Sequence, residues 1–307
     1  MRRNQKTAIF CSLLFCIYSH FSVAQQDGIA SQYHLNPSMI NPAYSGLYNS
    51  FLINANSRLQ WMGLAGNPKS NFLTVTTSII EKKVGGGLMF SQDNIGITST
   101  TEMAMMYAYR IEIDRSLLTL GLQGGFVNIK QKLEDLTLKT PDDPDFPQTT
   151  QSSMKPNFGA GIAMMGDNYF IGLSMPRLMN VKFGDGITNI AQYRRHYYAS
   201  AAFIKDITPF MKLKPVALIR YVEGAPMSYD IGANVLWNHK FWFGAYTRNF
   251  VTQGALFQFI LNQTVRMGYA IEVPTNKAVQ ARYISHEIVL GIDLSLFKNQ
   301  EAFLRYF

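Results

Sequence analysis

The chain alternates apolar and polar residues with a period of two from about residue 50 onward. In the segment 51–60, one face carries Phe51, Ile53, Ala55 and Leu59, and the other carries Asn54, Asn56, Arg58 and Gln60. Because successive side chains of a strand point to opposite faces, this pattern predicts a β-strand with one apolar and one polar face. The same alternation recurs at 229–238, 264–273 and 286–296.

Fourteen segments of this kind are predicted as strands. They lie at 50–60, 70–79, 84–91, 101–112, 117–130, 156–165, 168–175, 195–204, 212–222, 228–238, 241–249, 255–262, 264–273 and 286–296. An even strand number is typical of single-chain bacterial outer-membrane barrels. We therefore expect an all-β fold, a transmembrane antiparallel up-and-down β-barrel of about fourteen strands over 50–296, with its apolar face toward outer-membrane lipid. A soluble β-sandwich shows the same local alternation and remains the alternative at this point.

Composition favours the membrane. Charged residues make up 16% of the chain and aromatic residues 13%, whereas soluble proteins carry about 25% charged residues. Aromatic residues near strand ends are predicted to form girdles at the two membrane interfaces. The candidates are Tyr107, Tyr109, Tyr169, Phe170, Tyr197, Tyr198, Trp237, Phe241, Trp242, Phe243, Tyr246, Phe257 and Phe259. An ordinary hydrophobic core would also use such residues, and that alternative stays open.

The first residues predict export. Residues 1–24 have a basic start, an apolar stretch and the small-residue end Ser22-Val23-Ala24, which is the pattern of a signal peptide cleaved between Ala24 and Gln25. Cleavage would remove Cys11 and Cys16, the two cysteines of the chain. It would also lower the net charge from +8 by the three charges of Arg2, Arg3 and Lys6. The remaining basic residues are scattered, so no nucleic-acid partner is expected.

Two segments are predicted to lie outside the strands. Residues 25–49 contain Asn36-Pro37 and Asn41-Pro42, which favour turns, and we expect this segment either inside the lumen as a plug or on the periplasmic rim. Residues 297–307 are interpreted as a C-terminal tail, although an aromatic ending is also read by barrel assembly machinery. The longest connection, 131–155, carries prolines and aspartates typical of a solvated loop.

Several short motifs, in order along the chain, resemble those of the PorP/SprF family of outer-membrane proteins, which serve the type IX secretion system of Bacteroidota. The residues that carry the resemblance are Asn36, Pro37, Asn41, Pro42, Gly46, Arg58, Gln60, Trp61, Pro68, Lys69, His286, Glu287, Arg305, Tyr306 and Phe307. They span nearly the whole mature chain. Phe303 and Leu304 depart from the family, which often has Ser-Pro before the final Arg-Tyr-Phe.

The resemblance implies a non-catalytic barrel in the cell outer membrane that helps to secrete surface proteins or to hold them at the surface. Gliding adhesins are the familiar cargo of such proteins. Implied partners are other type IX secretion components, namely periplasmic ring and OmpA-like proteins, together with the secreted adhesin. The alternative that the strand pattern leaves open is a passive porin or a transporter of small hydrophobic solutes.

The sequence offers no recognisable catalytic constellation. Gly-x-Ser-x-Gly, His-Glu-x-x-His and phosphate-binding glycine motifs are all missing from it. The mature histidines are His34, His196, His239 and His286, and their spacing predicts no metal site. We therefore expect no enzyme activity, no cofactor and no metal. The glycines at 85–87 and 124–125 are expected to let the barrel curve or to make room for a plug.

Ionisable residues within predicted strands are expected to face the lumen, because an arginine facing lipid at mid-depth costs about 2–4 kcal/mol. The candidates are Arg58, Arg110, Arg220, Arg248, Arg266, Arg282, Glu102, Asp230, Glu272 and Asp293. They could form a selective path or a peptide-binding interior. The interpretation we favour is a salt-bridged network that closes the lumen.

Overall fold

The computed structural model describes residues 31–48, 50–80, 83–135, 149–183, 191–275 and 283–294. The strands are β1 (Phe51–Leu59), β2 (Lys69–Ile80), β3 (Val84–Ile95), β4 (Thr98–Ile113), β5 (Ser116–Gln131), β6 (Gln151–Met165), β7 (Tyr169–Arg177), β8 (Val181–Phe183), β9 (Ala191–Tyr193), β10 (His196–Phe203), β11 (Lys205–Thr208), β12 (Met211–Val222), β13 (Ser228–Trp237), β14 (Phe241–Arg248), β15 (Thr252–Ile260), β16 (Val265–Pro274) and β17 (Ser285–Leu294). Three short 3₁₀ helices are η1 (Pro37–Met39), η2 (Pro42–Tyr44) and η3 (Leu133–Asp135).

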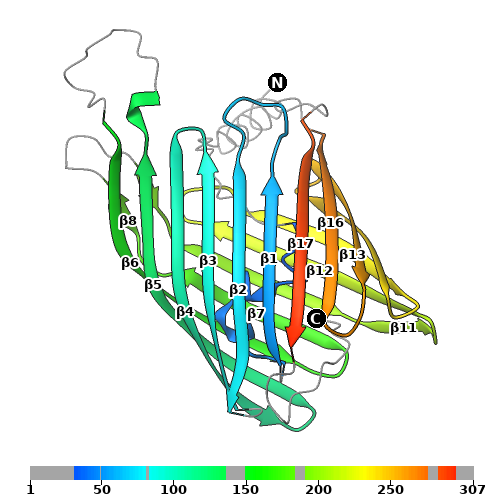
Figure 1. Cartoon of the computed structure of the whole chain (residues 1–307). Coiled ribbons are helices and arrows are strands. Elements are labelled where there is room, and N and C mark those ends of the chain that lie inside the picture. Colours follow the sequence, from blue (N-terminus) through cyan, green and yellow to red (C-terminus); the bar gives the residue numbers. More distant parts are fainter. Residues whose placement is uncertain are drawn as a thin grey trace, which may run out of the picture.

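The strands form a closed antiparallel barrel of 14 strands (Figure 1). β1 pairs with β17, and β10 pairs with both β7 and β12, so the sheet has no free long edge. β11 continues β10 beyond Ile204 along the same partner, β12, and the two segments count as one barrel strand. β8 and β9 form a separate two-stranded sheet. The predicted fold and strand number are confirmed.

The strand pairs are joined as simple hairpins. The register of β4 with β5 runs from Thr98↔Gln131 to Ile113↔Ser116, which leaves a two-residue turn. Between β13 and β14, Asn238 and His239 both have positive φ, 51° and 54°, as the tight turn between twisted strands requires. The turns 114–115, 166–168, 238–240 and 261–264 lie at one end of the barrel, here called the tight-turn end, and the connection 60–68 and the turns 96–97 and 249–251 lie at the other (Figure 1).

The two faces of each strand carry the residues that the alternation predicts. On β4, Met103, Met105 and Tyr107 are exposed on the outer face, and the neighbouring Glu102 and Ala104 are buried. On β1, the predicted polar positions Asn54, Asn56 and Arg58 are all buried inside. The outer face is therefore apolar and suited to lipid, while polar groups turn inward.

A membrane girdle requires its residues to lie on the outer face of the barrel, which is found for some of the predicted aromatic residues and is wrong for others. Tyr107, Tyr109, Tyr197, Trp237, Phe243 and Phe257 are exposed on the outer face. Phe170, Trp242 and Tyr246 are buried inside, and Tyr198 packs against the buried cluster of Tyr33, Ile40 and Leu218. The reason is strand parity. Trp242 and Tyr246 share an inner face of β14 with the charged Arg248, which follows them by six and two residues respectively.

Residues 31–48 lie within the barrel, and most of them are buried. They pass through η1 and η2, each of which begins with a proline, Pro37 and Pro42. A proline fits the first helical position because the missing N–H has no partner there anyway. In Figure 1 this segment is the blue coil enclosed by the strands.

Two glycines allow the backbone of this segment to touch the barrel wall. Gly46 has φ +64°, and a Cβ on it would overlap the carbonyl of Thr77. A Cβ on Gly85 would overlap the carbonyl of Ser45. The expectation that strand glycines make room for a plug therefore fits Gly85. At Gly124 and Gly125, in contrast, a Cβ would meet barrel residues of β6 and β4 rather than the segment.

Some sequence-based expectations fall outside the described residues. These are the signal peptide 1–24 with its cleavage after Ala24, the tail 297–307 with Arg305, Tyr306 and Phe307, and Arg282. Among the residues that the structure describes, no helix has the length and apolar character needed to cross a membrane.

Candidate functional site in the barrel interior

Glu287 anchors the start of the inner segment. Its carboxylate lies on β17 and is 1% exposed. It accepts hydrogen bonds from the backbone nitrogens of Ser31 at 2.5 Å and Gln32 at 3.1 Å, and from Arg58 Nη1 at 3.4 Å. The register pairs Arg58 of β1 directly with Glu287 of β17, so both side chains point inward at the same level. A buried carboxylate is tolerated here because charge and N–H donors surround it.

Arg58 joins a second buried carboxylate to the same cluster. Its Nη2 donates to Glu272 on β16, and its Nη1 donates to the hydroxyl of Ser31. Glu272 also accepts from Ser31 Oγ at 2.7 Å and from the Tyr246 hydroxyl at 2.6 Å. The guanidinium therefore lies between two carboxylates, and the inner segment contributes Ser31 to the same network.

The network continues around the wall through Arg248. Its Nη1 lies 3.4 Å from Glu272, and its Nε and Nη2 hold Asp230 at 2.9 Å and 2.8 Å. On the opposite wall, Arg177 pairs with Glu102 at 3.2 Å. Of the ionisable residues that were predicted to face the lumen, all those that the structure describes point inward. The expectation of a salt-bridged interior agrees with these contacts.

Asn36 and Asn41 fix the middle of the segment. Asn36 donates to Asn56 Oδ1 at 3.2 Å and accepts from the Thr74 hydroxyl at 2.9 Å. Asn41 caps η2 by accepting from the Ala43 nitrogen at 2.9 Å, and its Nδ2 donates to the carbonyls of β6 and β7 at 3.2 Å and 3.3 Å. An asparagine can do both because its amide offers an acceptor and two donors. Each Asn-Pro pair is thus a local turn that is also bonded to the wall.

The last part of the segment is held by apolar packing. Tyr44 stacks on Phe170 with ring centroids 4.4 Å apart, within a buried cluster that includes Ala43 and Leu47. Ser174 on β7 donates to the carbonyl of Ile40 at 2.6 Å. In the closed ring, β7 lies seven strands from β17 on either path. The segment is therefore bonded to diametrically opposite walls.

His34 is the titratable imidazole of this segment. Burial, with a smaller contribution from the nearby Lys214 ammonium, lowers the pKa of His34 from 6.5 to about 3. The imidazole is therefore neutral at physiological pH.

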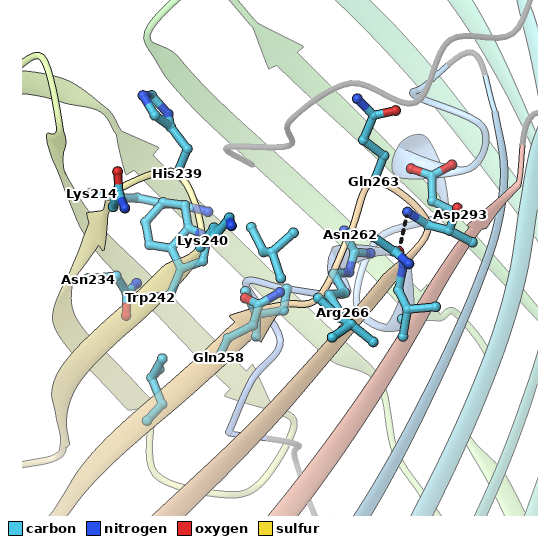
Figure 2. Close-up of a pocket in the computed structure, with 18 of the residues that line it drawn as sticks. Lys214, Asn234, His239, Lys240, Trp242, Gln258, Asn262, Gln263, Arg266 and Asp293 are labelled. Carbon is cyan, nitrogen blue, oxygen red and sulfur yellow. Dashed lines mark hydrogen bonds between the residues drawn. The ribbon is translucent and has the colours of Figure 1, made fainter.

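Two cavities lie toward opposite ends of the barrel interior. The larger, of about 360 Å³, is at the tight-turn end and is lined by His34, Lys214, Trp242, Gln258, Arg266 and Asp293, among others (Figure 2). The smaller, of about 150 Å³, is near the connection 60–68 and is lined by Arg58, Gln60, Trp61, Arg220, Arg248 and Glu272, among others. Both walls are rich in basic groups.

The motif residues separate into groups. Asn36, Pro37, Asn41, Pro42 and Gly46 lie in the inner segment and meet the walls, while Arg58 and Glu287 hold its start. Gln60 and Pro68 close the connection between β1 and β2 through a 2.9 Å backbone bond, and Trp61 N donates to Ser285 Oγ at 3.2 Å. Lys69 begins β2, away from the cluster. His286 bonds Tyr269 at 2.6 Å on the outer face.

Lys214 and Trp242 were missed as interior residues by sequence reasoning. Lys214 is 3% exposed, and its ammonium lies 5.7 Å from the Trp242 ring centroid. Lys214 lies an even number of positions from Arg220 along β12, so the alternation would have predicted that both side chains point into the barrel. In the described part of the chain, no group of three or more His, Cys, Asp or Glu side chains is placed to hold a metal ion.

Comparison with known families decides what this barrel is. The model of the type IX secretion system membrane protein PorP/SprF matches residues 22–292. The chain belongs to the PorP/SprF family. The match includes both the inner segment and the strands that hold it. A comparison with curated protein sequences gave no match.

Solved structures show that the PorP/SprF chain has an outer-membrane barrel fold. The CymD monoaromatic hydrocarbon channel is 10% identical with a TM-score of 0.52, covering 86% of this chain and 92% of CymD. The outer membrane protein Omp33 of Acinetobacter baumannii is 10% identical with a TM-score of 0.47, covering 81% and 99%. At these identities the likeness concerns the fold alone.

Proposed function

We propose that this PorP/SprF barrel is a non-enzymatic component that supports type IX secretion and the surface localisation or anchoring of secreted proteins such as gliding adhesins. Family membership supports the secretion role. The proposed partners are periplasmic ring and OmpA-like proteins of the same system, together with the adhesin cargo. Short turns of bacterial barrels usually face the periplasm, so the tight-turn end is the proposed side for the periplasmic partners.

One observation carries this proposal over a passive pore. The segment 31–48 crosses the interior and is bonded to β17 on one side and β7 on the other. A conduit for solutes needs a continuous water-filled or apolar path, and this segment lies across it. The barrel is better suited to present a rigid surface to other proteins, with the segment supporting the wall from inside.

The proposed export signal is tested separately from the secretion role. Cleavage between Ala24 and Gln25 predicts that the protein purified from outer membranes begins at Gln25. Intact-mass measurement and N-terminal sequencing both report this directly. A mature protein that retains residues 1–24 would contradict the proposal.

The secretion role is tested by comparing surface and culture-fluid proteomes with and without the gene. Loss of one or a few large adhesin-like proteins from the surface supports a cargo-specific role, and loss of all type IX cargo supports a core role. Complementation with the wild-type gene is the control. Unchanged proteomes would overturn the proposal and leave permeability as the next question.

A further inference from the structure

The cavity of about 360 Å³ at the tight-turn end has the size of a small-molecule site, since ligand pockets run from about 300 to 1,000 Å³. It lies between the inner segment, which contributes His34 and Leu35, and the inner face of β12 to β17. The turns 238–240 and 261–264 form its rim. The cavity is therefore built partly from the segment and partly from the wall.

Its walls combine an apolar surface with basic groups. Trp242, Leu256 and Ile260 provide the apolar part, and Trp242 is 4% exposed. Lys214, Lys240 and Arg266 line it as cations, whereas Asp293 is the acidic side chain in the lining. Figure 2 shows Lys214, Asn234 and Trp242 on one side and Arg266 and Asp293 on the other. This combination suits a ligand with an anionic head and a compact apolar body.

Three uncharged lining side chains also carry a buried polar atom without a hydrogen-bond partner in the described structure. These atoms are His34 Nε2, Asn234 Nδ2 and Gln258 Oε1. Asn234 and Gln258 are 2% and 4% exposed. Leaving such a buried group unpaired costs about 1–3 kcal/mol. An occupant that formed hydrogen bonds with these side chains would offset that cost.

Two glycines make room for this arrangement. A Cβ on Gly244 would overlap Asn234 Oδ1, and a Cβ on Gly291 would overlap the Nε of Arg266. Arg266 is further fixed because its Nη2 donates to Asn54 Oδ1 at 2.8 Å. The polar groups of the cavity are therefore held in place by the strands around them.

We propose that this cavity is a binding site for a carboxylate carried on a compact apolar or aromatic body. The Trp242 face takes the apolar part, and Lys214 and Arg266 take the carboxylate. The carboxylate can belong to a free organic acid or to an acidic side chain of a periplasmic peptide. This site goes beyond the proposed secretion role and does not depend on it.

The first test uses Trp242 as a reporter. The chain has three tryptophans, so the double variant Trp61→Phe/Trp237→Phe leaves Trp242 as the sole one. The detergent-purified barrel is titrated with benzoate, with neutral benzamide, and with a blocked Glu-Phe dipeptide. We expect a saturable fluorescence change with benzoate or the dipeptide, and at least tenfold weaker binding of benzamide. Benzoate binding identifies a free acid as the source, and dipeptide binding identifies a peptide.

The second test uses variants to identify the residues that bind the carboxylate. Lys214→Met should weaken binding at least tenfold, while the matched control Lys205→Met, whose side chain is exposed on β11 outside the cavity, should bind as the parent does. If Lys214→Met fails to fold, Arg266→Gln provides the same test by removing the other cation that is proposed to hold the carboxylate. The absence of saturable binding of both carboxylates, equal binding of benzamide, or unchanged binding in the folded variant would overturn the proposal.

Discussion

The carboxylate of Glu287, near the start of the last described strand, accepts the backbone N–H of Ser31 at 2.5 Å across 256 positions of sequence. This bond joins the inner segment to the strand that closes the barrel against β1. Arg58 contacts the same carboxylate from β1 at 3.4 Å. Closure of the barrel and seating of the segment therefore share one buried carboxylate.

Replacing Glu287 with glutamine should destabilise the barrel and loosen the segment. The change keeps the shape but removes one of the two carboxylate charges that balance Arg58, and breaking a buried ion pair from one side costs up to about 3–5 kcal/mol. Heat-modifiable gel mobility reports barrel unfolding, and limited proteolysis reports cleavage within 31–48. Glu112→Gln, at an exposed position of β4, is the matched control. Equal behaviour of the two variants would contradict the anchoring role of Glu287.

Gly121→Ala should disturb the seating of the segment. A Cβ at Gly121 would overlap the backbone of Ala43, and inserting volume into a packed interior costs about 1–3 kcal/mol. Gly124→Ala on the same strand is the control, since its Cβ would meet Phe158 at an ordinary 3.4 Å. We expect a lower unfolding temperature and faster proteolysis for the first variant alone. Equal unfolding temperatures and equal proteolysis rates for the two variants would show that the segment does not need close contact at Gly121 to stay in place.

Acid should weaken the seating of the segment through His34. The pKa of His34 is lowered to about 3 in the folded protein from 6.5 when free, so the displaced segment binds a proton more readily than the seated one. The contribution of neutral His34 is complete above pH 6.5 and falls as the pH drops toward 3. Protease protection of 31–48 should therefore decrease between pH 7.5 and pH 5. His34→Gln should reduce that decrease, and an unchanged pH profile in this variant would contradict the assignment.

The intact protein should show no steady open-channel current in planar bilayers, because the segment crosses the interior. A variant lacking residues 31–48 should conduct, provided that heat-modifiable mobility shows a folded barrel. A 14-strand barrel without its filling encloses space that water can enter. A stable large conductance from the intact protein would instead support the passive-porin alternative.

Much of the fold follows from local pattern. Period-two alternation located all fourteen barrel strands, with boundaries close to those of the structure, because each strand must offer an apolar face to lipid and a polar face to the interior. The same rule placed Arg58 and Glu272 inside. The prediction was wrong for Trp242 and Tyr246, which were expected on the outer face because they are aromatic. Both lie an even number of positions from Arg248, so the alternation places them on the inner face with it.

The sequence by itself determined the strands, their faces and the turns, since these depend on neighbours along the chain. The meeting of Ser31, Arg58, Glu272 and Glu287 was decided by tertiary structure alone. It depends on β17 closing against β1 in a register that sets Arg58 opposite Glu287. The contact of Gly85 with Ser45 and the cavity beside Lys214 likewise depend on how an inner segment fits a closed wall. These contacts are between residues far apart in the chain, so the local alternation of apolar and polar residues cannot predict them.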